Sequence, residues 1–273
     1  MSDLANIDYQ PLQAMKGAYV TVLKNGGLPL AVLGICVVIA GVLIVNGAFI
    51  LTIYPFFICF IYLGFQVKKF KNSVWQNFAI ANGWALDQTT SPAELVPPSV
   101  QFGRDPHYSP VIQAQLGNIA SDLLLYDCTT GSGKSSDTHY FTVARVRLPK
   151  VLPHLLLSSK KSRAYIQKDL LDSQTLELEG DFNDYFKLQI EKGQQVDALT
   201  VLTPDVMQVL VNYNKSEDIE ILGWNLYFIL NGDKRAAEDV QSLIQSVVEL
   251  TEQIVQNINL ASVSAPPVAA ALS

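Results

Sequence analysis

A stretch of forty residues, from Leu28 to Val67, contains no aspartate, glutamate, lysine or arginine. One continuous helix of that length would measure about 60 Å, roughly twice the ~30 Å hydrocarbon core of a bilayer. Asn46-Gly47, a strong turn signal, lies near the middle of the stretch. The alternative, a buried helix pair in a soluble protein, fits poorly with so many consecutive uncharged residues. The sequence therefore predicts two membrane spans, 28–45 and 48–67, joined by a tight turn.

Basic residues stand on both sides of this stretch. Lys16 and Lys24 precede the first expected span, while Lys68, Lys69 and Lys71 follow the second. The turn between the spans carries no charge, so the positive-inside rule predicts a plasma-membrane protein with both termini in the cytoplasm. We expect these lysines to contact the membrane surface, because anionic headgroups attract them. Three cysteines without C-x-x-C spacing fit the same reducing compartment.

Composition divides the chain into five parts. After the apolar stretch, apolar residues recur on one helical face, and Asn82-Gly83 predicts the end of that helix. The segment from Asp87 to Ser109 is rich in proline and short polar side chains, which predicts a loop. We therefore expect a juxtamembrane arm at 1–27, a transmembrane hairpin at 28–67, a juxtamembrane helix and loop at 68–109, a cytoplasmic domain at 110–259 and a disordered tail at 260–273.

From Val111 onward the chain changes to short apolar runs that are typical of strands. The alternation shifts phase at Ala144-Arg145, which suggests a bulge. Thr203-Pro204 resembles a helix start, and the periodic segment 232–260 predicts a long amphipathic helix. These features predict an α+β fold with a mostly antiparallel sheet and a long C-terminal helix. The expected strands are 111–116, 121–128, 140–148, 154–159, 175–180, 186–190 and 196–202, followed by a hairpin around Gly223.

The segment TTGSGKSSDTHY, residues 129–140, contains part of a phosphate-binding pattern. A working phosphate loop reads G-x-x-x-x-G-K-[ST] and leads directly into a helix, whose backbone amides hold the phosphates. Here Cys128 stands in place of the first glycine, and an expected strand follows Lys134. The segment therefore predicts a hairpin loop rather than a nucleotide site.

The remaining polar residues give no catalytic, cofactor-binding or metal-binding pattern. His107, His139 and His154 have no partners at metal-ligand spacing, so we expect surface or strand-edge histidines. Four acidic residues in 177–184 lack the EF-hand arrangement of oxygen ligands. A solvated acidic turn is therefore favoured over a cation site. The sequence assigns no catalytic, cofactor or metal role to any residue.

Three segments share a pattern with known sequences. They are FNDYFKLQI, with Phe182 and Phe186, the acidic-to-LTP junction at 197–207, and DIEILGWNLYFIL, whose expected hairpin covers 219–230. Over about 140–230 the chain resembles a bacterial membrane protein family of unknown function, domain-of-unknown-function family 3137. The resemblance implies transmembrane segments joined to a cytoplasmic domain, and it implies no catalytic residues.

Together these observations predict a membrane-anchored cytoplasmic domain that binds or scaffolds an unidentified ligand without enzymatic activity. The alternative is a membrane-bound hydrolase or nucleotide-dependent enzyme that uses the 129–139 loop or the acidic 177–184 turn. The expected partners are the lipid bilayer and a protein, and the net charge of −6 argues against nucleic acid. An apolar stripe on the C-terminal helix packs either on the protein's own sheet or on a second copy. It consists of Val240, Leu243, Val247, Leu250 and Ile254.

Overall fold

The chain forms two units. Asp8–Gly83 is helical, and Trp84–Ser273 together with Met1–Ile7 forms an α+β unit. In this computed structural model the described residues are 4–25, 27–47, 51, 53–87, 91–162, 173–178, 180–213, 216–232 and 236–264.

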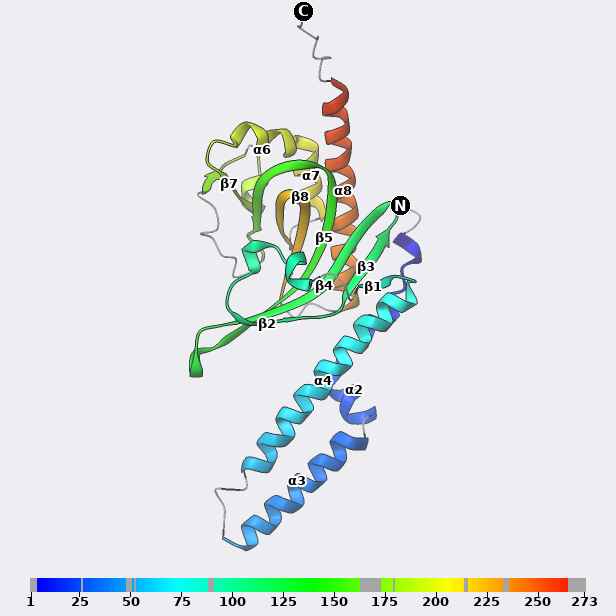
Figure 1. The fold of residues 1–273 in the computed structure, drawn as a ribbon, viewed down its shortest axis with the longest axis vertical. Coiled ribbons are helices and arrows are strands. Elements are labelled where there is room, and N and C mark those ends of the chain that lie inside the picture. Colours follow the sequence, from blue (N-terminus) through cyan, green and yellow to red (C-terminus); the bar gives the residue numbers. More distant parts are fainter. Residues whose placement is uncertain are drawn as a thin grey trace, which may run out of the picture. The chain divides into compact units, whose positions relative to one another are not determined.

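Two long helices dominate the helical unit. They pack side by side and run antiparallel (Figure 1). Asn46 and Gly47 form the predicted turn after the first of them, and Gly47 adopts a left-handed φ of 76°. The second long helix stops before Gly83, also left-handed with φ 68°, as the sequence predicted. The helices of this unit are α1 (Gln10–Gln13), α2 (Ala18–Asn25), α3 (Gly27–Val45) and α4 (Ile53–Ala81).

The N-terminal arm folds back onto the C-terminal half of α4. The ring of Tyr9 stacks on Phe78 with 5.9 Å between centroids. The backbone amide of Asp8 donates to Oδ1 of Asn82 at 2.7 Å, and Nδ2 of Asn82 donates to the carbonyl of Asp8 at 3.0 Å. Because Leu12 and Met15 are also buried, the arm belongs to the packed part of the helical unit.

The α+β unit is built on one sheet. Within the described residues, eight strands pair antiparallel in the order β1-β3-β4-β5-β7-β6, with β2 on β4 and β8 on β5. The predicted α+β class and its antiparallel sheet are therefore confirmed. The strands are β1 (Ala85–Asp87), β2 (Arg104–Tyr108), β3 (Val111–Leu116), β4 (Ile119–Thr130), β5 (Asp137–Ser159), β6 (Ser173–Leu176), β7 (Phe186–Glu191) and β8 (Asp218–Asn231).

Helices complete the unit around this sheet. The predicted C-terminal helix is confirmed, and it packs on β5 and β8 with α7 beside it (Figure 1). It continues to Ser264, beyond the predicted start of a disordered tail at 260, and residues 265–273 lie outside the described residues. The helices are α5 (Phe182–Tyr185), α6 (Gln195–Val201), α7 (Pro204–Tyr213) and α8 (Ala237–Ser264), with short 3₁₀ turns at Leu4–Asn6, Pro92–Leu95, Pro98–Val100 and Gly133–Ser135.

The apolar stripe of α8 is part of this core. All of its residues are at most 2% exposed, and the neighbouring elements are β5, β8 and α7. The stripe therefore packs on the protein's own sheet, which was the first of the two expectations. In this fold those side chains are not available to a second copy. They are Val240, Leu243, Val247, Leu250 and Ile254.

The sheet bends in the middle of β5 and β8. We expected a bulge at Ala144-Arg145 and a hairpin at Gly223, but β5 keeps its register with β4 through Arg145. The register with β8 shifts instead between Arg147 and Leu155. Pro149 and Pro153 lie in that interval and cannot donate ladder hydrogen bonds. Gly223 has φ 60° and lies opposite Leu152, so it bends one continuous strand.

Two further predictions differ from the structure. The expected strand 196–202 is the helix α6, because Ala198 and Val201 recur at helical spacing and both are buried. The expected loop 87–109 begins at the last residue of β1 and contains β2. Leu95 and Val100, between these strands, join the core cluster of the sheet. Apolar residues spaced among prolines therefore supply core side chains here rather than a solvated loop.

Candidate functional site

The five lysines predicted to contact the membrane all lie on the helical unit. Lys24 is in the last turn of α2, and Lys16 is in the turn before that helix. Lys68, Lys69 and Lys71 follow directly after the apolar part of α4. Because α3 and α4 run antiparallel, the start of α3 and the end of the apolar part of α4 lie at the same end of the pair. The structure thus brings Lys24 and the three lysines of α4 to one end of an apolar helix pair.

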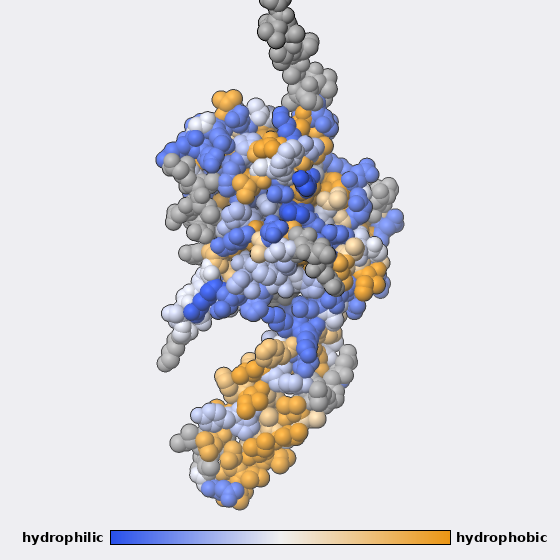
Figure 2. All heavy atoms as spheres, viewed as in Figure 1, coloured by the Kyte–Doolittle hydropathy of each residue, from blue (hydrophilic) through white to orange (hydrophobic). Residues whose placement is uncertain are grey.

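The apolar side chains of this pair are open to the surroundings. Val38 on α3 is 66% exposed and Phe60 on α4 is 75% exposed, and Figure 2 shows apolar residues gathered over both helices. Among the described residues, one helix, α4, is long and apolar enough to cross a membrane. The apolar part of α3 with described side chains, Ala31–Val45, is shorter. Soluble monomers rarely expose so large a contiguous apolar surface.

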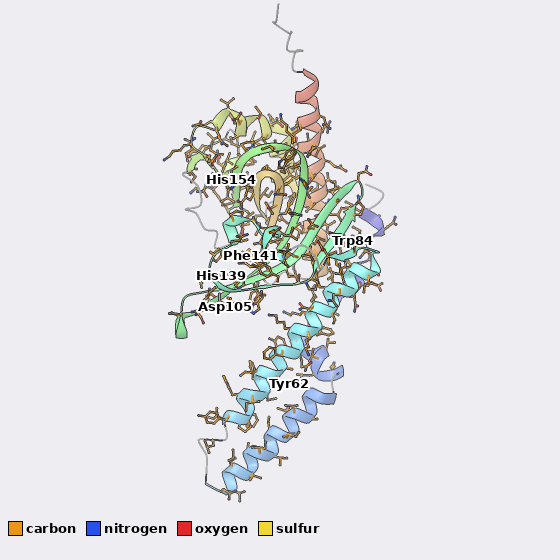
Figure 3. All side chains as sticks on the ribbon, in the orientation of Figure 1. Tyr62, Trp84, Asp105, His139, Phe141 and His154 are labelled. Carbon is orange, nitrogen blue, oxygen red and sulfur yellow. The ribbon has the colours of Figure 1, made fainter. Side chains whose placement is uncertain are left out.

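A buried histidine–glutamate contact lies in the α+β unit. Nε2 of His154, which is labelled on β5 in Figure 3, is 2.8 Å from Oε1 of Glu220 on β8. The side chain of Glu220 is 1% exposed and that of His154 is 13% exposed. The backbone amide of Ser99 donates to the other oxygen, Oε2, at 3.3 Å. Both carboxylate oxygens therefore have a partner.

His154 also lines a cavity of about 510 Å³ at the bend of β5. Its walls come from β5, the bend of β8, the end of β7 and α6, and they carry charges of both signs. Lys150 stands on one side, and Glu191 and Asp197 stand on another. Within the described parts of the chain, no three His, Cys, Asp or Glu side chains are grouped so that they could hold a metal ion.

A second buried carboxylate stands two residues earlier on β8. Asp218 accepts a hydrogen bond from the amide of Ser159 at 2.7 Å and another from the hydroxyl of Ser162 at 2.6 Å. Burial raises the pKa of Asp218 to about 7, although these two hydrogen bonds act in the opposite direction. The side chain is therefore close to half-protonated at neutral pH.

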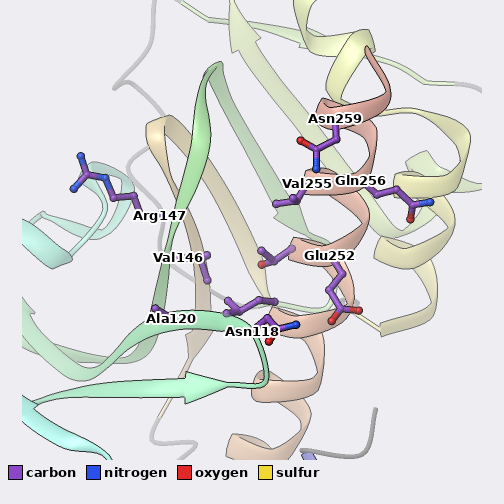
Figure 4. A pocket seen from close by; sticks show the side chains of 10 residues that line it. Asn118, Ala120, Val146, Arg147, Glu252, Val255, Gln256 and Asn259 are labelled. Carbon is purple, nitrogen blue, oxygen red and sulfur yellow. The ribbon is translucent and has the colours of Figure 1, made fainter. Parts of the chain in front are cut away.

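A larger cavity, here called the α8 cavity, lies between α8 and the start of β4 (Figure 4). Its volume is about 750 Å³. The hydroxyl of Thr251 is buried at its wall without a hydrogen-bond partner. The cavity is lined by Asn118, Ile119, Ala120, Val146, Arg147, Thr251, Glu252, Val255, Gln256 and Asn259.

The loop proposed for an enzymatic alternative is a hairpin turn. Thr130 pairs with Asp137, and β5 begins directly after the short 3₁₀ turn Gly133–Ser135. The loop is therefore followed by a strand, and no helix follows it whose backbone amides could hold a phosphate. Thr130 and His139 are joined by a 2.8 Å hydrogen bond across the hairpin.

The other histidine and the acidic turn are at the surface. His107, on β2, is half exposed and contacts Asp127 at 3.3 Å. In the acidic turn, Glu177, Asp181 and Asp184 are exposed, and Glu179 lies outside the described residues. These placements match the expected solvated turn and strand-edge histidine.

Sequence reasoning missed the buried polar residues. His154 was expected at the surface or a strand edge, but the structure pairs it with Glu220. The available signal was the run EDIEIL, which places acidic residues inside an apolar strand. A carboxylate in such a run must find a partner when its strand is buried on both faces. Thr251 had no comparable signal, because a threonine within a helix is ordinarily satisfied by that helix.

Comparison with protein-family models and with curated protein sequences finds no match to this chain. Among solved structures, the chain is similar to the mycobacterial trehalose monomycolate transport factor A, TtfA. That similarity has a TM-score of 0.43 and 8% sequence identity, and it covers 68% of this chain and 93% of that chain. Similarity at this level does not indicate a shared ligand or activity.

Proposed function

We propose that this chain is a membrane-anchored binding protein whose α+β unit lies in the cytoplasm. The observation that carries the proposal is the apolar helix pair, whose exposed side chains need a hydrocarbon environment. In this proposal both α3 and α4 cross the bilayer, and the connection after Asn46-Gly47 lies outside. The lysines at the other end of the pair then face the cytoplasmic leaflet.

A binding function is favoured over an enzymatic one. The two regions named for the enzymatic alternative, 129–139 and 177–184, lie on a hairpin turn and on an exposed turn, and neither lines the α8 cavity. We also propose, from the pattern over 140–230, that the chain is related to domain-of-unknown-function family 3137. A protein partner would bind the α+β unit outside the α8 stripe, which is occupied by the protein's own sheet.

Cysteine labelling in intact cells tests the topology. Native Cys128 is a poor reporter because it is buried, and burial raises the pKa of its thiol. In a background without native cysteines, Asn46→Cys should react with an impermeant thiol reagent from outside. Ser132→Cys, in the exposed β4–β5 turn, should react only after permeabilisation. Labelling of Ser132→Cys in intact cells would overturn the proposed orientation.

A protease site inserted before Leu4 separates two spans from one. If both α3 and α4 cross the membrane, this site is cut only after permeabilisation. If α4 alone crosses, the N-terminus lies on the opposite side from the α+β unit, and the site is cut in intact cells. Carbonate extraction gives the control, since the full chain should stay with the membrane fraction in either case.

A further inference from the structure

We propose that the α8 cavity binds an uncharged amphiphile, with an apolar body along the sheet and a hydroxyl or carbonyl group at Thr251. This inference concerns the α+β unit alone. It does not depend on how many times the chain crosses the membrane, so either proposal can fail without the other.

The hydroxyl of Thr251 is the anchoring feature. The residue is 3% exposed, and its Oγ1 has no hydrogen-bond partner. A threonine within a helix usually bonds the carbonyl four residues earlier, here that of Val247. Ser246, five residues earlier on α8, is also buried, but its hydroxyl donates to the carbonyl of Tyr213 at 2.8 Å. A buried hydroxyl left unpaired is destabilising, so Thr251 is poised to bond a ligand group.

The walls beside Thr251 are apolar. Ile119, Ala120 and Val146 form the sheet side of the cavity, and Val255 projects toward it from α8 (Figure 4). Most small-molecule sites have volumes of roughly 300–1,000 Å³, with an apolar lining and few polar groups. The α8 cavity, at about 750 Å³, has that size, and its apolar wall lies beside polar and charged lining residues. An alkyl chain or a ring would bury its apolar surface against these side chains.

The charges around the cavity disfavour an anionic ligand. Glu252 places an exposed carboxylate at the rim. Arg147 supplies part of the lining, but its guanidinium points away from α8 (Figure 4). The other polar lining residues, Asn118, Gln256 and Asn259, are neutral amides. A ligand carboxylate or phosphate would meet a like charge without a compensating cation, so an anionic group is disfavoured. The neutral Thr251 hydroxyl at the wall is the partner that an uncharged hydroxyl or carbonyl group would find.

Photolabelling of the full chain in phosphatidylcholine nanodiscs tests this assignment. The probe is a long-chain alcohol with a diazirine in its chain, compared with the carboxylic acid of the same chain length. The alcohol should label peptides that contain 118–120 and 251–259, and excess unlabelled alcohol should remove this labelling. The acid should label the same peptides several-fold less. Labelling restricted to α3, α4 and lipid would overturn the proposal.

Variants of Thr251 separate a ligand site from a structural role. Thr251→Val should weaken binding of the alcohol about two- to tenfold, the effect of one hydrogen bond, while thermal stability stays equal or rises. Thr251→Ser should restore binding. Val255→Phe, which fills the cavity, should abolish labelling, and Val255→Ala should retain it.

Unchanged affinity in Thr251→Val means that water already satisfies the hydroxyl, and this overturns the proposal. Cross-links from a diazirine-bearing amino acid placed at position 255 to residues 265–273, or to a second copy, would show a peptide in the cavity and also overturn the proposal.

Discussion

Nε2 of His154 and Oε1 of Glu220 lie 2.8 Å apart, although the two residues are separated by 66 positions in the sequence. The pairing of β5 with β8 creates this contact, since Leu156 and Glu220 are register partners. A carboxylate without a partner at this depth would be strongly destabilising. The imidazole, together with the Ser99 amide, is therefore what allows Glu220 to occupy a fully buried position.

Replacing His154 by alanine should destabilise the α+β unit. Removing the imidazole leaves one oxygen of a fully buried carboxyl group without its hydrogen-bond partner, and this typically costs about 1–3 kcal/mol. The double variant His154→Ala with Glu220→Gln should recover about half of that loss, because an amide needs no counter-charge. Native-state hydrogen exchange of β5 peptides gives the stability of the natural protein, of His154→Ala, of Glu220→Gln and of the double variant. Equal losses in the single and double variants would show that the two side chains are not coupled.

Asp218 should make stability depend on pH. Its folded pKa, about 7, lies above the ordinary value of 3.8, so the folded state holds a proton that the unfolded state releases. Stability contributed by this proton is fully present below about pH 4, falls as pH rises through 7, and is then constant. The shift corresponds to at most about 4 kcal/mol. Asp218→Asn, which keeps a neutral side chain, should flatten the stability profile of the α+β unit between pH 4 and 8. If stability changed with pH by the same amount in Asp218→Asn and in the natural protein, another group would be responsible for the pH dependence.

Asn82 should hold the N-terminal arm in place. Besides its two hydrogen bonds with Asp8, it donates to the carbonyl of Phe78 at 2.9 Å. Asn82→Ala should weaken arm packing by about 1–2 kcal/mol, and trypsin cleavage after Lys16 should rise about five- to thirtyfold. Asn77→Ala, an exposed site on the same helix, is the matched control and should cleave at the natural rate. Equal rates in both variants would mean that aromatic packing alone holds the arm.

The lysines after the apolar part of α4 should set the orientation of the chain. Replacing Lys68, Lys69 and Lys71 by glutamine removes most of the positive charge near the expected cytoplasmic end, and we expect a fraction of the molecules to insert inverted. External labelling of Ser132→Cys measures that fraction. Replacing Lys160 and Lys161, which belong to the α+β unit and follow the spans by many residues in the sequence, should leave the topology unaltered. If replacing Lys160 and Lys161 inverted the chain and replacing the three lysines of α4 did not, the role given to those three would be contradicted.

Local periodicity explains which elements could be predicted from the sequence. The strand at 111–116 matches β3 because buried and exposed residues mostly alternate along it. Where both faces of a strand are covered, alternation disappears. In β5 the residues Phe141 to Ala144 are all buried, so the apparent phase shift there was not a bulge. Short apolar runs such as 196–202 fit a helix or a strand equally well, and only packing decides between them.

The buried polar sites depend on contacts between distant parts of the chain. Glu220 meets His154 only because β5 bends at its prolines and keeps β8 beside it on both sides of the bend. Thr251 lines a cavity whose other side is formed by the start of β4, more than a hundred residues earlier. A residue's type and its neighbours in sequence do not encode such contacts. The apolar helices and the lysines beside them, by contrast, could be predicted from composition and from the order of residues along the chain.

Leu243 provides the sharpest test of the packing of α8. It is fully buried in the stripe that contacts the sheet, and truncating a buried leucine typically costs about 2–5 kcal/mol. Leu243→Ala should lower the stability of the α+β unit by that amount, with hydrogen exchange accelerated in both α8 and β5. Gln245→Ala, an exposed position on the same helix, should change stability by less than about 0.5 kcal/mol. Because the stripe faces the protein's own sheet, cross-linking between copies in the membrane should be the same for both variants. If Leu243→Ala left stability intact and abolished cross-linking, the stripe would be an interface between copies rather than part of the core.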